Sequence, residues 1–379
     1  MASMVTRSVS ERSRLRVLAV ASEAGSAKAV VPVLACLSGR GADLHALLPT
    51  EVLALANAVW PEVEWGKLAA ALHDQTVEEA VASRPDVILV GTTARVSLER
   101  KLVVHGRKHG IPTLSVVDER YGYRRRFEDE GGGLRYLPDL VVVMDDGCAE
   151  AAIVEGIPAD RLRVTGSPIL SFLAYEYAGR RPGVEATLFR TPPGWKRVTF
   201  ISETFARDNG SAPSERGRLG PFLGFTEETV CRDLLAVLRE IGQPTLLLEK
   251  LHPSDDTQPM ESQADELLIW GQIKGGELWP LLMESDVVIG MRSMALLEAA
   301  LLGCHVASYQ PNLIGENLCG AVRFGVAARL NNPEDLRCWL RKSLTAESRC
   351  QPPPVDLPFI RPDAADRVAD LVLGATGER

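Results

Sequence analysis

The 379-residue sequence has no apolar run that approaches the roughly 18 uninterrupted residues of a membrane-spanning helix. The apolar stretch at 15–22 follows basic residues, but it is too short for a spanning helix and has the period of a core strand. Basic residues are also not in excess, since 42 Lys and Arg stand against 50 Asp and Glu, for a formal net charge of −8. We therefore expect a cytoplasmic protein with no integral membrane segment and no nucleic-acid partner.

Patterned cysteines and several common motifs are missing. The seven cysteines form no C-x-x-C pair and show no Cys/His ligand spacing, so we expect reduced, mostly buried thiols. There is no Walker loop, no G-x-G-x-x-G after the first strand, no G-x-S-x-G, no H-E-x-x-H and no D-x-D between apolar runs. These absences disfavour a P-loop kinase, a simple NAD enzyme and metal-dependent chemistry.

What the sequence does contain is an alternation of short apolar runs and longer helical patterns, starting at Leu15. This alternation is typical of βαβ units that build a parallel sheet. The apolar runs, such as 85–91, 138–145 and 285–291, are nearly continuous, as expected of strands that helices cover on both faces. The hydrophobic fraction of 46% and charged fraction of 24% are those of a soluble globular protein, and the length allows two substantial domains.

The pattern therefore predicts an α/β fold with two Rossmann-like, doubly wound parallel-sheet domains that face a central cleft. We expect a disordered lead-in at 1–13, an N-terminal domain at 14–180 and a C-terminal domain at 197–360. Between them, 181–196 interrupts the pattern with glycines and prolines and is the expected linker. The helical pattern within 361–379 can return to the N-terminal domain. Polar residues at strand ends are then the candidates for a site, because ligands bind beyond the carboxyl ends of parallel strands.

The strongest candidate site lies in residues 285–311. A strand ends at Gly290, and the turn through Arg292 and Ser293 enters a helix whose first N–H groups can hold a phosphate. Glu298, one and a half turns later, can accept hydrogen bonds from ribose hydroxyls. The alternative is that Ser293 is a simple N-cap and Glu298 a solvated helix residue. We favour the binding role because Glu298 stands among apolar neighbours.

Two further strand ends in the C-terminal half carry polar side chains. Lys250 and His252 flank Leu251 and point the same way, so they can contact a diphosphate or sugar hydroxyls. His252 is also a candidate catalytic base. Ser202 and Glu203 end the strand at 197–203 and are candidate donor contacts. The alternative for Lys250 is a chance surface position.

In the N-terminal half, the turn after the first strand contains Glu23, Gly25 and Ser26 and is a candidate sugar or anion cradle. Such a turn is weak evidence, since every βα unit needs one. Glu23 is well placed to remove a proton from an attacking hydroxyl, and Asp118, at the end of the fourth strand, is a rival for that role. Thr92, which follows the third strand, is a candidate acceptor contact.

The most basic stretch of the chain is 120–127, where arginines alternate with aromatic residues. Arg120 and Tyr123 in this stretch are candidate contacts for an anionic acceptor or a stacked ring. The alternative is a loop edge whose arginines pair with the acidic residues at 128–130.

Together these features resemble the GT-B superfamily of nucleotide-sugar enzymes over about residues 15–345. The resemblance depends on four segments: the small-residue loop after the first strand, PDLVVVMDDGCAEAAIVEGIPADRLRVTGSPIL, KLHP, and MRSMALLEAALLGCHVASYQP. It implies that Ser293 and Met294 hold the donor phosphates and that Glu298 holds the ribose.

Two branches of this superfamily compete. The nonhydrolysing UDP-N-acetylglucosamine 2-epimerases share the layout, but their Gly-Asp after the third strand is Gly91-Thr92 here. Their Glu-Ala-Gly-Leu-Arg segment is replaced from Asp118 onward, and their Ser-Gly-Gly by residues 291–293. Glycosyl transfer is therefore favoured. The His-Pro pair is also similar to that of transferases that use CDP-glycerol, which leaves the donor nucleotide open.

The resemblance thus implies a metal-independent glycosyltransferase of the hexosyl- or N-acetylhexosaminyl-transferase type. It would move a sugar from a nucleoside-diphosphate sugar, UDP-linked by preference, to a small-molecule or glycan acceptor in carbohydrate or natural-product biosynthesis. No cofactor is implied, and a homodimer is compatible with it. A 2-epimerase-like enzyme and a non-catalytic two-lobed protein that binds a nucleotide or sugar remain the alternatives.

Overall fold

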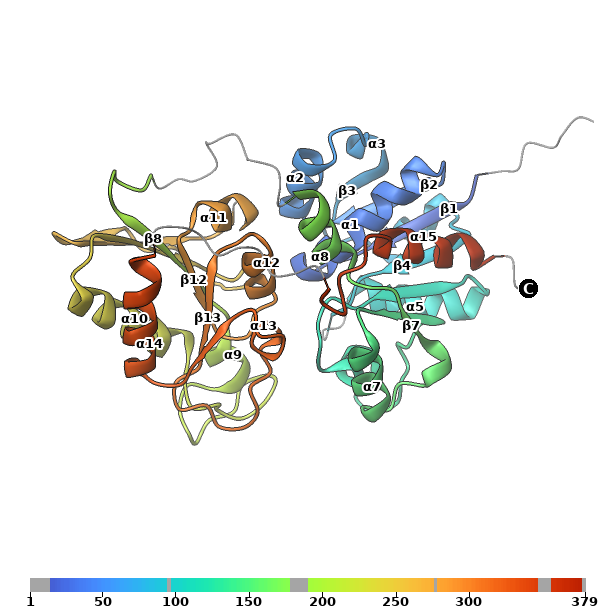
Figure 1. The fold of residues 1–379 in the computed structure, drawn as a ribbon. Helices are drawn as coiled ribbons and strands as arrows, with labels where there is room; N and C mark the ends of the chain where they lie inside the picture. Colours follow the sequence, from blue (N-terminus) through green and yellow to red (C-terminus); the bar gives the residue numbers. More distant parts are fainter. Residues whose placement is uncertain (1–13, 94–96, 178–189, 276–277, 347–355, 377–379) are drawn as a thin grey trace, which may run out of the picture. The chain divides into compact units, whose positions relative to one another are not determined.

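The computed structural model describes residues 14–93, 97–177, 190–275, 278–346 and 356–376. The predicted lead-in at 1–13 and most of the predicted linker at 181–196 lie outside these residues. The chain divides into two compact units, each built around one sheet (Figure 1). The first consists of Met1–Asp118, Gly122–Thr165 and Asp363–Arg379, and the second of Glu119–Tyr121 and Gly166–Pro362.

The first unit contains a sheet of seven parallel strands among the described residues, in the order β3-β2-β1-β4-β5-β6-β7. These strands are β1 (Arg16–Val20), β2 (Asp43–Leu48), β3 (Ala69–Ala71), β4 (Val87–Val90), β5 (Thr113–Val116), β6 (Leu140–Val143) and β7 (Leu162–Val164). β1 pairs with β2 on one side and β4 on the other, so the strand order reverses between β1 and β4. That reversal is the topological switch point where ligands of open parallel sheets bind.

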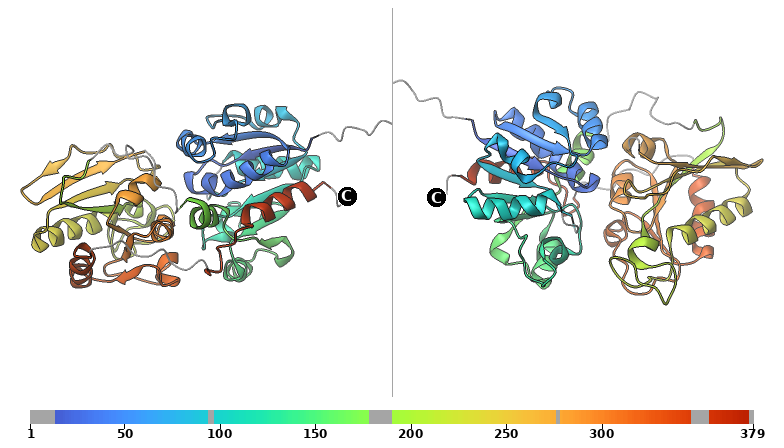
Figure 2. Two further views of the ribbon diagram at one scale, coloured as in Figure 1. Left: turned by 45° about the horizontal axis from the view of Figure 1, so that its top comes forward. Right: turned by 180° about the vertical axis from the view of Figure 1, so that it is seen from behind.

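Helices cover both faces of this sheet (Figure 2). They are α1 (Ala24–Gly39), α2 (Thr50–Val59), α3 (Trp65–Leu68), α4 (Val77–Ala80), α5 (Leu98–His109), α6 (Tyr123–Phe127), α7 (Asp146–Val154) and α15 (Ala364–Gly374), with 3₁₀ turns η1 (Val81–Ser83) and η2 (Ala159–Arg161). Leu18 and Val20 of β1, Ile88 of β4 and Leu102 of α5 belong to one buried cluster. The nearly all-apolar strands are thus sandwiched between helices, as their sequences predict.

The C-terminal helix α15 packs against α1 of the first unit (Figures 1 and 2). Arg40, just after α1, makes ion pairs with Asp366 and Asp370 of α15. Val368 and Val372 of α15 are fully buried. The end of the chain therefore contributes to the core and to the charged rim of the unit in which the chain begins.

The second unit contains a seven-stranded sheet among the described residues, in the order β10-β11-β9-β8-β12-β13-β14. Its strands are β8 (Lys196–Ile201), β9 (Thr245–Lys250), β10 (Gln263–Ala264), β11 (Leu268–Ile273), β12 (Val287–Gly290), β13 (His305–Tyr309) and β14 (Ala328–Leu330). All pairs are parallel except that between β10 and β11. The strand order reverses between β8 and β12, so this sheet also has a switch point.

The second unit also contains helices that alternate with its strands along the chain. They are α8 (Pro168–Phe172), the π-helical turn η3 (Leu173–Tyr177), α9 (Phe205–Asn209), α10 (Glu227–Ile241), α11 (Leu278–Glu284), α12 (Ala295–Leu301), α13 (Gly320–Arg323) and α14 (Pro333–Leu344). α10 begins at the N-cap Thr226, whose hydroxyl accepts the Thr229 N–H, and it ends at Gly242 in the left-handed conformation that favours glycine (φ +70°). Val230 and Leu234 on its inner face are fully buried, each side chain contributing about 1.5–3 kcal/mol.

Residues 166–177 belong to the second unit, whereas the sequence pattern places them before the linker. The reason is aromatic packing, because Phe172 and Tyr177 lie 6.2 and 4.7 Å from the ring of Trp279. The Ser167 N–H also donates to the Phe359 carbonyl. Sequence patterning detects the elements α8 and η3 but not the partners onto which their side chains pack.

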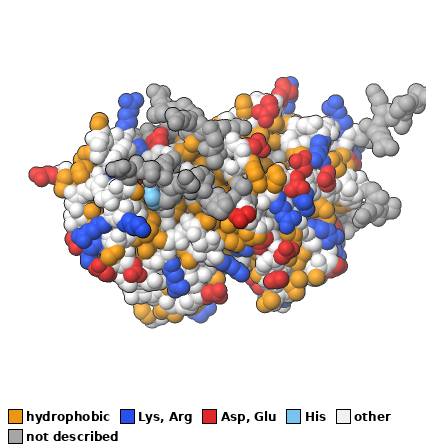
Figure 3. All heavy atoms as spheres, viewed as in Figure 1, with side chains coloured by type: hydrophobic (Ala, Val, Ile, Leu, Met, Phe, Trp, Pro, Cys, Tyr) orange, Lys and Arg blue, Asp and Glu red, His pale blue; other side chains and the backbone are white. Residues whose placement is uncertain are grey.

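Within the described residues, no helix combines the length and the hydrophobicity that crossing a membrane requires. On the face shown in Figure 3, acidic and basic side chains lie interspersed with hydrophobic ones. This mixture agrees with the near balance of acidic and basic residues in the composition.

Candidate functional site

Polar side chains gather at the switch point of the first sheet. Glu23 follows β1, Thr92 follows β4, and Asp118 follows β5. The Thr92 hydroxyl donates to Asp118 Oδ1 over 3.0 Å, and Arg126 Nη1 donates to the Thr92 hydroxyl over 3.0 Å and lies 3.7 Å from Asp118 Oδ1. The Thr93 hydroxyl donates to Glu23 Oε1 at 3.5 Å. We call Glu23, Thr92, Thr93, Asp118 and Arg126 the first cluster.

The orientation of Asp118 is fixed by partners that are largely buried. Thr92 and Arg126 are only 4% and 7% exposed, and Asp118 is 16% exposed at its side chain. A Cβ added to Gly25 would lie 2.6 Å from Asp118 Oδ2, so the carboxylate fits against bare backbone at the start of α1. This close approach explains why a glycine stands at position 25.

Ser26 and Tyr123, two predicted acceptor contacts, are buried. Ser26 is fully buried and its hydroxyl donates to the Glu23 carbonyl. The Tyr123 side chain is also fully buried, in the core of the first unit. Neither residue presents a side chain to a ligand in this conformation.

Several arginines of the basic stretch at 120–127 make contacts with other residues of the protein. Arg124 pairs with Glu128 at 3.1 Å, and the backbone N–H of Arg124 donates to Glu155. The Arg120 guanidinium lies 4.5 Å from the centre of the Phe324 ring. Pairing with the acidic residues at 128–130, the alternative that the sequence leaves open, thus describes Arg124, whereas Arg126 lies near Asp118 and Arg120 stacks on an aromatic ring.

At the switch point of the second sheet, a carboxylate occupies the turn that the sequence assigns to phosphate. Glu203 follows β8, and its Oε1 accepts hydrogen bonds from the backbone N–H groups of Met291, Arg292 and Ser293 at 3.2, 2.8 and 3.0 Å. Burial raises the pKa of Glu203, although Arg292 and these N–H groups favour the charged form. Three N–H groups that could bind an anion are therefore already satisfied by Glu203.

Arg292 lies beside this carboxylate. Its Nε is 4.0 Å from Glu203 Oε2, and its guanidinium lies 4.6 Å from the centre of the Phe205 ring. The side chain is 14% exposed. Ser293 closes the turn, because its hydroxyl accepts the Ala295 N–H, and Met294 directly precedes α12. We call Glu203, Arg292, Ser293, Lys250 and His252 the second cluster.

Lys250 and His252 lie at the end of β9, which is a neighbour of β8. Lys250 is 8% exposed. The Ser254 N–H donates to His252 Nδ1 at 3.2 Å, which requires that Nδ1 accept and that the proton of the neutral imidazole be on Nε2. This tautomer offers the Nε2 N–H for donation to an anionic oxygen, and both predicted roles of His252, donor contact and base, stay predictions.

Glu298 and Ser202 are both buried and face different parts of the second unit. Glu298 is 4% exposed, and its Oε2 accepts the indole N–H of Trp279, which is 1% exposed. The carboxylate among apolar neighbours thus has an internal partner, and contact with a ribose stays a prediction. Ser202 is 2% exposed and lines a pocket beside α10, and its predicted contact with the donor stays a prediction.

Sequence reasoning missed Glu99, Thr93 and Arg126. Glu99, on α5, is 2% exposed, and its Oε1 accepts the Ser22 N–H at 2.6 Å, which ties α5 to the turn after β1. An acid in the first turn of a helix is a common pattern, so its sequence gives no signal of this contact. No group of three His, Cys, Asp or Glu side chains is arranged to hold a metal ion in the part of the chain that the structure describes.

Comparisons with known proteins agree on the fold. No family model and no curated protein matches the sequence. Among solved structures, UDP-GlcNAc 2-epimerase of Methanocaldococcus jannaschii, in complex with UDP-GlcNAc and UDP, is 12% identical with a TM-score of 0.61, covering 95% of this chain and 99% of that one. S. aureus MnaA, solved with UDP, is 12% identical with a TM-score of 0.63, covering 96% and 98%.

A glycosyltransferase is also similar in structure. The glycotransferase of kitacinnamycin is 14% identical with a TM-score of 0.51, and the match covers 96% of each chain. At such identities the likeness concerns the fold alone. The epimerases and the transferase share the architecture that the sequence predicts for this chain. The chain therefore has the GT-B fold of two α/β units.

Proposed function

We propose that the protein is a metal-independent glycosyltransferase that uses a nucleoside-diphosphate sugar. The observation that carries the proposal is the placement of one polar cluster at each switch point of the two sheets. The first cluster has the character of an acid–base site, with an oriented carboxylate. The second has the character of an anion site, with the cationic side chains of Arg292 and Lys250 and the imidazole of His252. Both are needed for transfer of a sugar from a diphosphate to a hydroxyl or amine.

In the second cluster, Arg292, Lys250 and His252 would stabilise the negative charge that develops on the departing diphosphate. Glu203 is then a positioning residue, because its three hydrogen bonds hold the turn that carries Arg292. His252 would donate from Nε2, since its Nδ1 accepts from Ser254. Ser293 and Met294 are proposed to lie at the phosphates and Glu298 near the ribose, as the GT-B resemblance implies.

In the first cluster, Asp118 is the preferred base for the acceptor. Its Oδ1 is oriented by Thr92 and Arg126, and this fixed carboxylate would take the proton of the attacking group. Glu23 is the runner-up, because its hydrogen bond from Thr93 is long, at 3.5 Å. A carboxylate that its neighbours hold in place is better suited to proton transfer, which depends on geometry before it depends on pKa.

The base assignment is tested with Asp118→Asn and Glu23→Gln, with the exposed Asp160→Asn as a matched control. If Asp118 is the base, Asp118→Asn lowers kcat by about 10²- to 10⁴-fold while donor affinity stays within about twofold. Asp160→Asn leaves both unchanged. A kcat loss confined to Glu23→Gln would transfer the role to Glu23, and no loss in either variant would contradict acid–base chemistry in the first cluster.

Epimerisation is the second candidate, because several proteins of similar structure are UDP-GlcNAc 2-epimerases. The two reactions differ in what happens without an acceptor. An epimerase converts the bound donor to a second sugar, which NMR of the donor alone detects, whereas a transferase leaves the donor intact until an acceptor is added. Conversion of a nucleotide sugar without acceptor would replace the transferase proposal by epimerisation. A protein that binds the donor without any conversion would be a binding module.

A further inference from the structure

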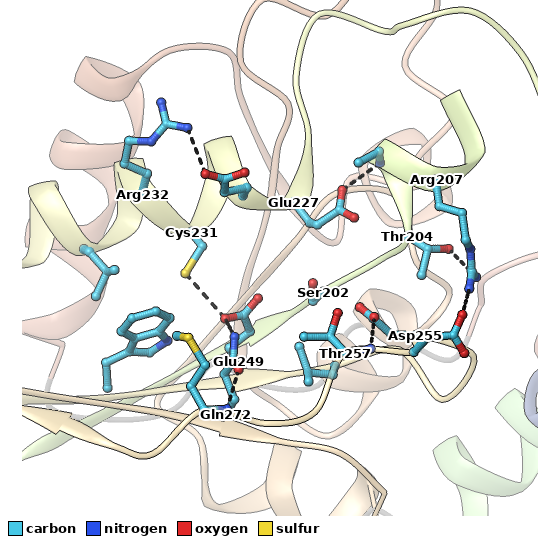
Figure 4. A pocket seen from close by; sticks show the side chains of 17 residues that line it. Ser202, Thr204, Arg207, Glu227, Cys231, Arg232, Glu249, Asp255, Thr257 and Gln272 are labelled. Carbon is cyan, nitrogen blue, oxygen red and sulfur yellow. Dashed lines mark hydrogen bonds and ion pairs between the residues drawn. The ribbon is translucent and has the colours of Figure 1, made fainter. Parts of the chain in front are cut away.

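Beside α10, the second unit contains an open pocket of about 720 Å³ that the proposed reaction does not use. Its walls come from the end of β8, from β9 and β11, and from the first turns of α10 (Figure 4). Leu235, Leu251 and Met260 supply apolar surface, and Trp270 an aromatic ring. A concave site with apolar walls and a few convergent polar groups is the usual form of a small-molecule site.

Glu249 is the central polar group of this pocket. It is 5% exposed, and its Oε2 accepts hydrogen bonds from the Gln272 amide at 2.8 Å and from the Cys231 thiol at 3.5 Å. Both partners are neutral, since burial raises the pKa of Cys231 and keeps it a thiol. Among the described residues, the side-chain partners of Glu249 are these two groups, and neither carries a positive charge. A buried carboxylate without a cation is costly, so a cationic ligand would be stabilised there.

Two further polar atoms at the pocket have no hydrogen-bond partner among the residues that the structure describes. They are the hydroxyl of Ser202, a residue only 2% exposed, and the indole N–H of Trp270. In Figure 4 the Ser202 hydroxyl lies between Glu249 and Glu227, among the side chains that line the pocket. Buried polar groups are normally paired, so these two atoms indicate a ligand that offers hydroxyl or carbonyl oxygens.

The charged side chains around the pocket indicate which sign of charge a ligand would carry. Two arginines and five carboxylates line it: Arg207, Arg232, Glu227, Glu228, Glu249, Asp255 and Asp256. Arg207 is engaged by the carbonyl and hydroxyl of Ser254, and Arg232 lies 3.7 Å from Glu228. The lining is therefore net negative, which favours a cation and disfavours a phosphate or a nucleotide.

We propose that this α10 pocket binds a hydroxylated ring that carries a protonated amine, such as an amino sugar or an aminocyclitol. The ammonium group pairs with Glu249, ring hydroxyls bond to Ser202 and to the indole N–H of Trp270, and the apolar face of the ring lies against the hydrophobic wall. The volume accommodates two such rings. The proposal does not rest on the proposed function, because it concerns binding in the absence of donor and of turnover.

The test is calorimetric titration of the full-length protein with neamine, a two-ring compound with four amines, and with its fully N-acetylated form. Neamine is expected to bind, and the acetylated form, which keeps the rings and hydroxyls but not the charges, at least about tenfold more weakly, a difference of about 1.4 kcal/mol. Glu249→Gln should lose about tenfold in neamine affinity, because it keeps the shape of the side chain and removes its charge.

Glu240→Gln is the matched control, since Glu240 lies on α10, the helix beside the pocket, but does not line the pocket and pairs with Arg337. It carries the same change in net charge and should bind neamine like the wild type. Trp270→Phe, which removes one N–H and keeps an aromatic ring, is the second variant, and it should weaken binding even if Glu249→Gln fails to fold.

The proposal is overturned if neamine does not bind at millimolar concentration, or if the acetylated form binds equally well. It is also overturned if Glu249→Gln and Glu240→Gln lose affinity to the same degree, which would identify general attraction to an acidic protein. None of these results bears on nucleotide-sugar binding, which is measured separately.

Discussion

The carboxylate of Glu203 is the most testable element of the second cluster, because all three of its backbone bonds converge on one oxygen. Glu203→Ala removes the acceptor from three N–H groups. At about 1 kcal/mol for each group left without a partner, the cost is about 3 kcal/mol. Glu203→Gln keeps a carbonyl oxygen in the same place, so it should stay within about 1 kcal/mol of the wild type.

The effect of pH separates charge from hydrogen bonding. Burial raises the pKa of Glu203 above its ordinary value, so the folded protein holds this proton more tightly than the unfolded chain does. The corresponding stability is fully present below the unfolded pKa and is lost as the pH rises through the folded pKa. Glu203→Gln abolishes this titration. As the pH rises above the ordinary pKa of a glutamate, the stability of Glu203→Gln should therefore improve relative to that of the wild type.

Hydrogen exchange of a peptide that covers residues 287–294 is the appropriate assay, because it reports on the turn itself and does not assume that both units unfold together. Glu203→Ala should speed exchange of the three amides by about two orders of magnitude, and Glu203→Gln by about fivefold at most. If Gln exchanges as fast as Ala, the charge and not the hydrogen bonds holds the turn. If Ala exchanges like the wild type, Glu203 does not position the turn at all.

Two other substitutions test contacts in the separate units. Gly25→Ala should push on the carboxylate of Asp118, because the new Cβ would lie 2.6 Å from Oδ2, and we expect at least about a tenfold loss of kcat with little change in thermal stability. Gly39→Ala, in the same helix and with no atom within 4 Å of its added Cβ, should be neutral or stabilising, so equal losses in both would refute the steric argument. Trp279→Phe removes the N–H that donates to buried Glu298, so it should lower the free energy of unfolding by about 2–3 kcal/mol, as measured by urea titration. An unchanged urea midpoint would show that Glu298 has another sufficient partner.

The fold was largely predictable because its strands are short, apolar and regularly spaced. The strands predicted within 285–291 and 244–253 are observed as β12 and β9, and polar residues lie at their ends as expected. The GT-B architecture is confirmed by solved structures that share little sequence with this chain. Local patterning and burial on both faces of a sheet determine these features, and both can be recognised within a window of ten residues.

The partners of the site residues were not predictable, because they depend on sheet order and packing. Glu203 contacts the turn at 291–293 because β8 and β12 are neighbours in the sheet, although 88 residues separate Glu203 from Met291. The burial of the Glu298 carboxylate is likewise explained by its hydrogen bond from Trp279, which lies on another helix. The sequence marks both carboxylates as unusual, but it does not distinguish a ligand from an internal N–H group as the partner.

The central claim, transfer of a sugar from a nucleotide donor, is tested most directly by nucleotide release. The protein is incubated with UDP-, GDP-, dTDP-, ADP- and CDP-linked sugars, and thermal stabilisation and free nucleotide are followed with and without a pool of hydroxyl and amine acceptors. The account predicts that donors of one base series stabilise the protein and that their nucleotide is released only when acceptor is present. If no donor stabilises the protein, or if nucleotide sugars are converted without any acceptor, glycosyl transfer by this chain is contradicted.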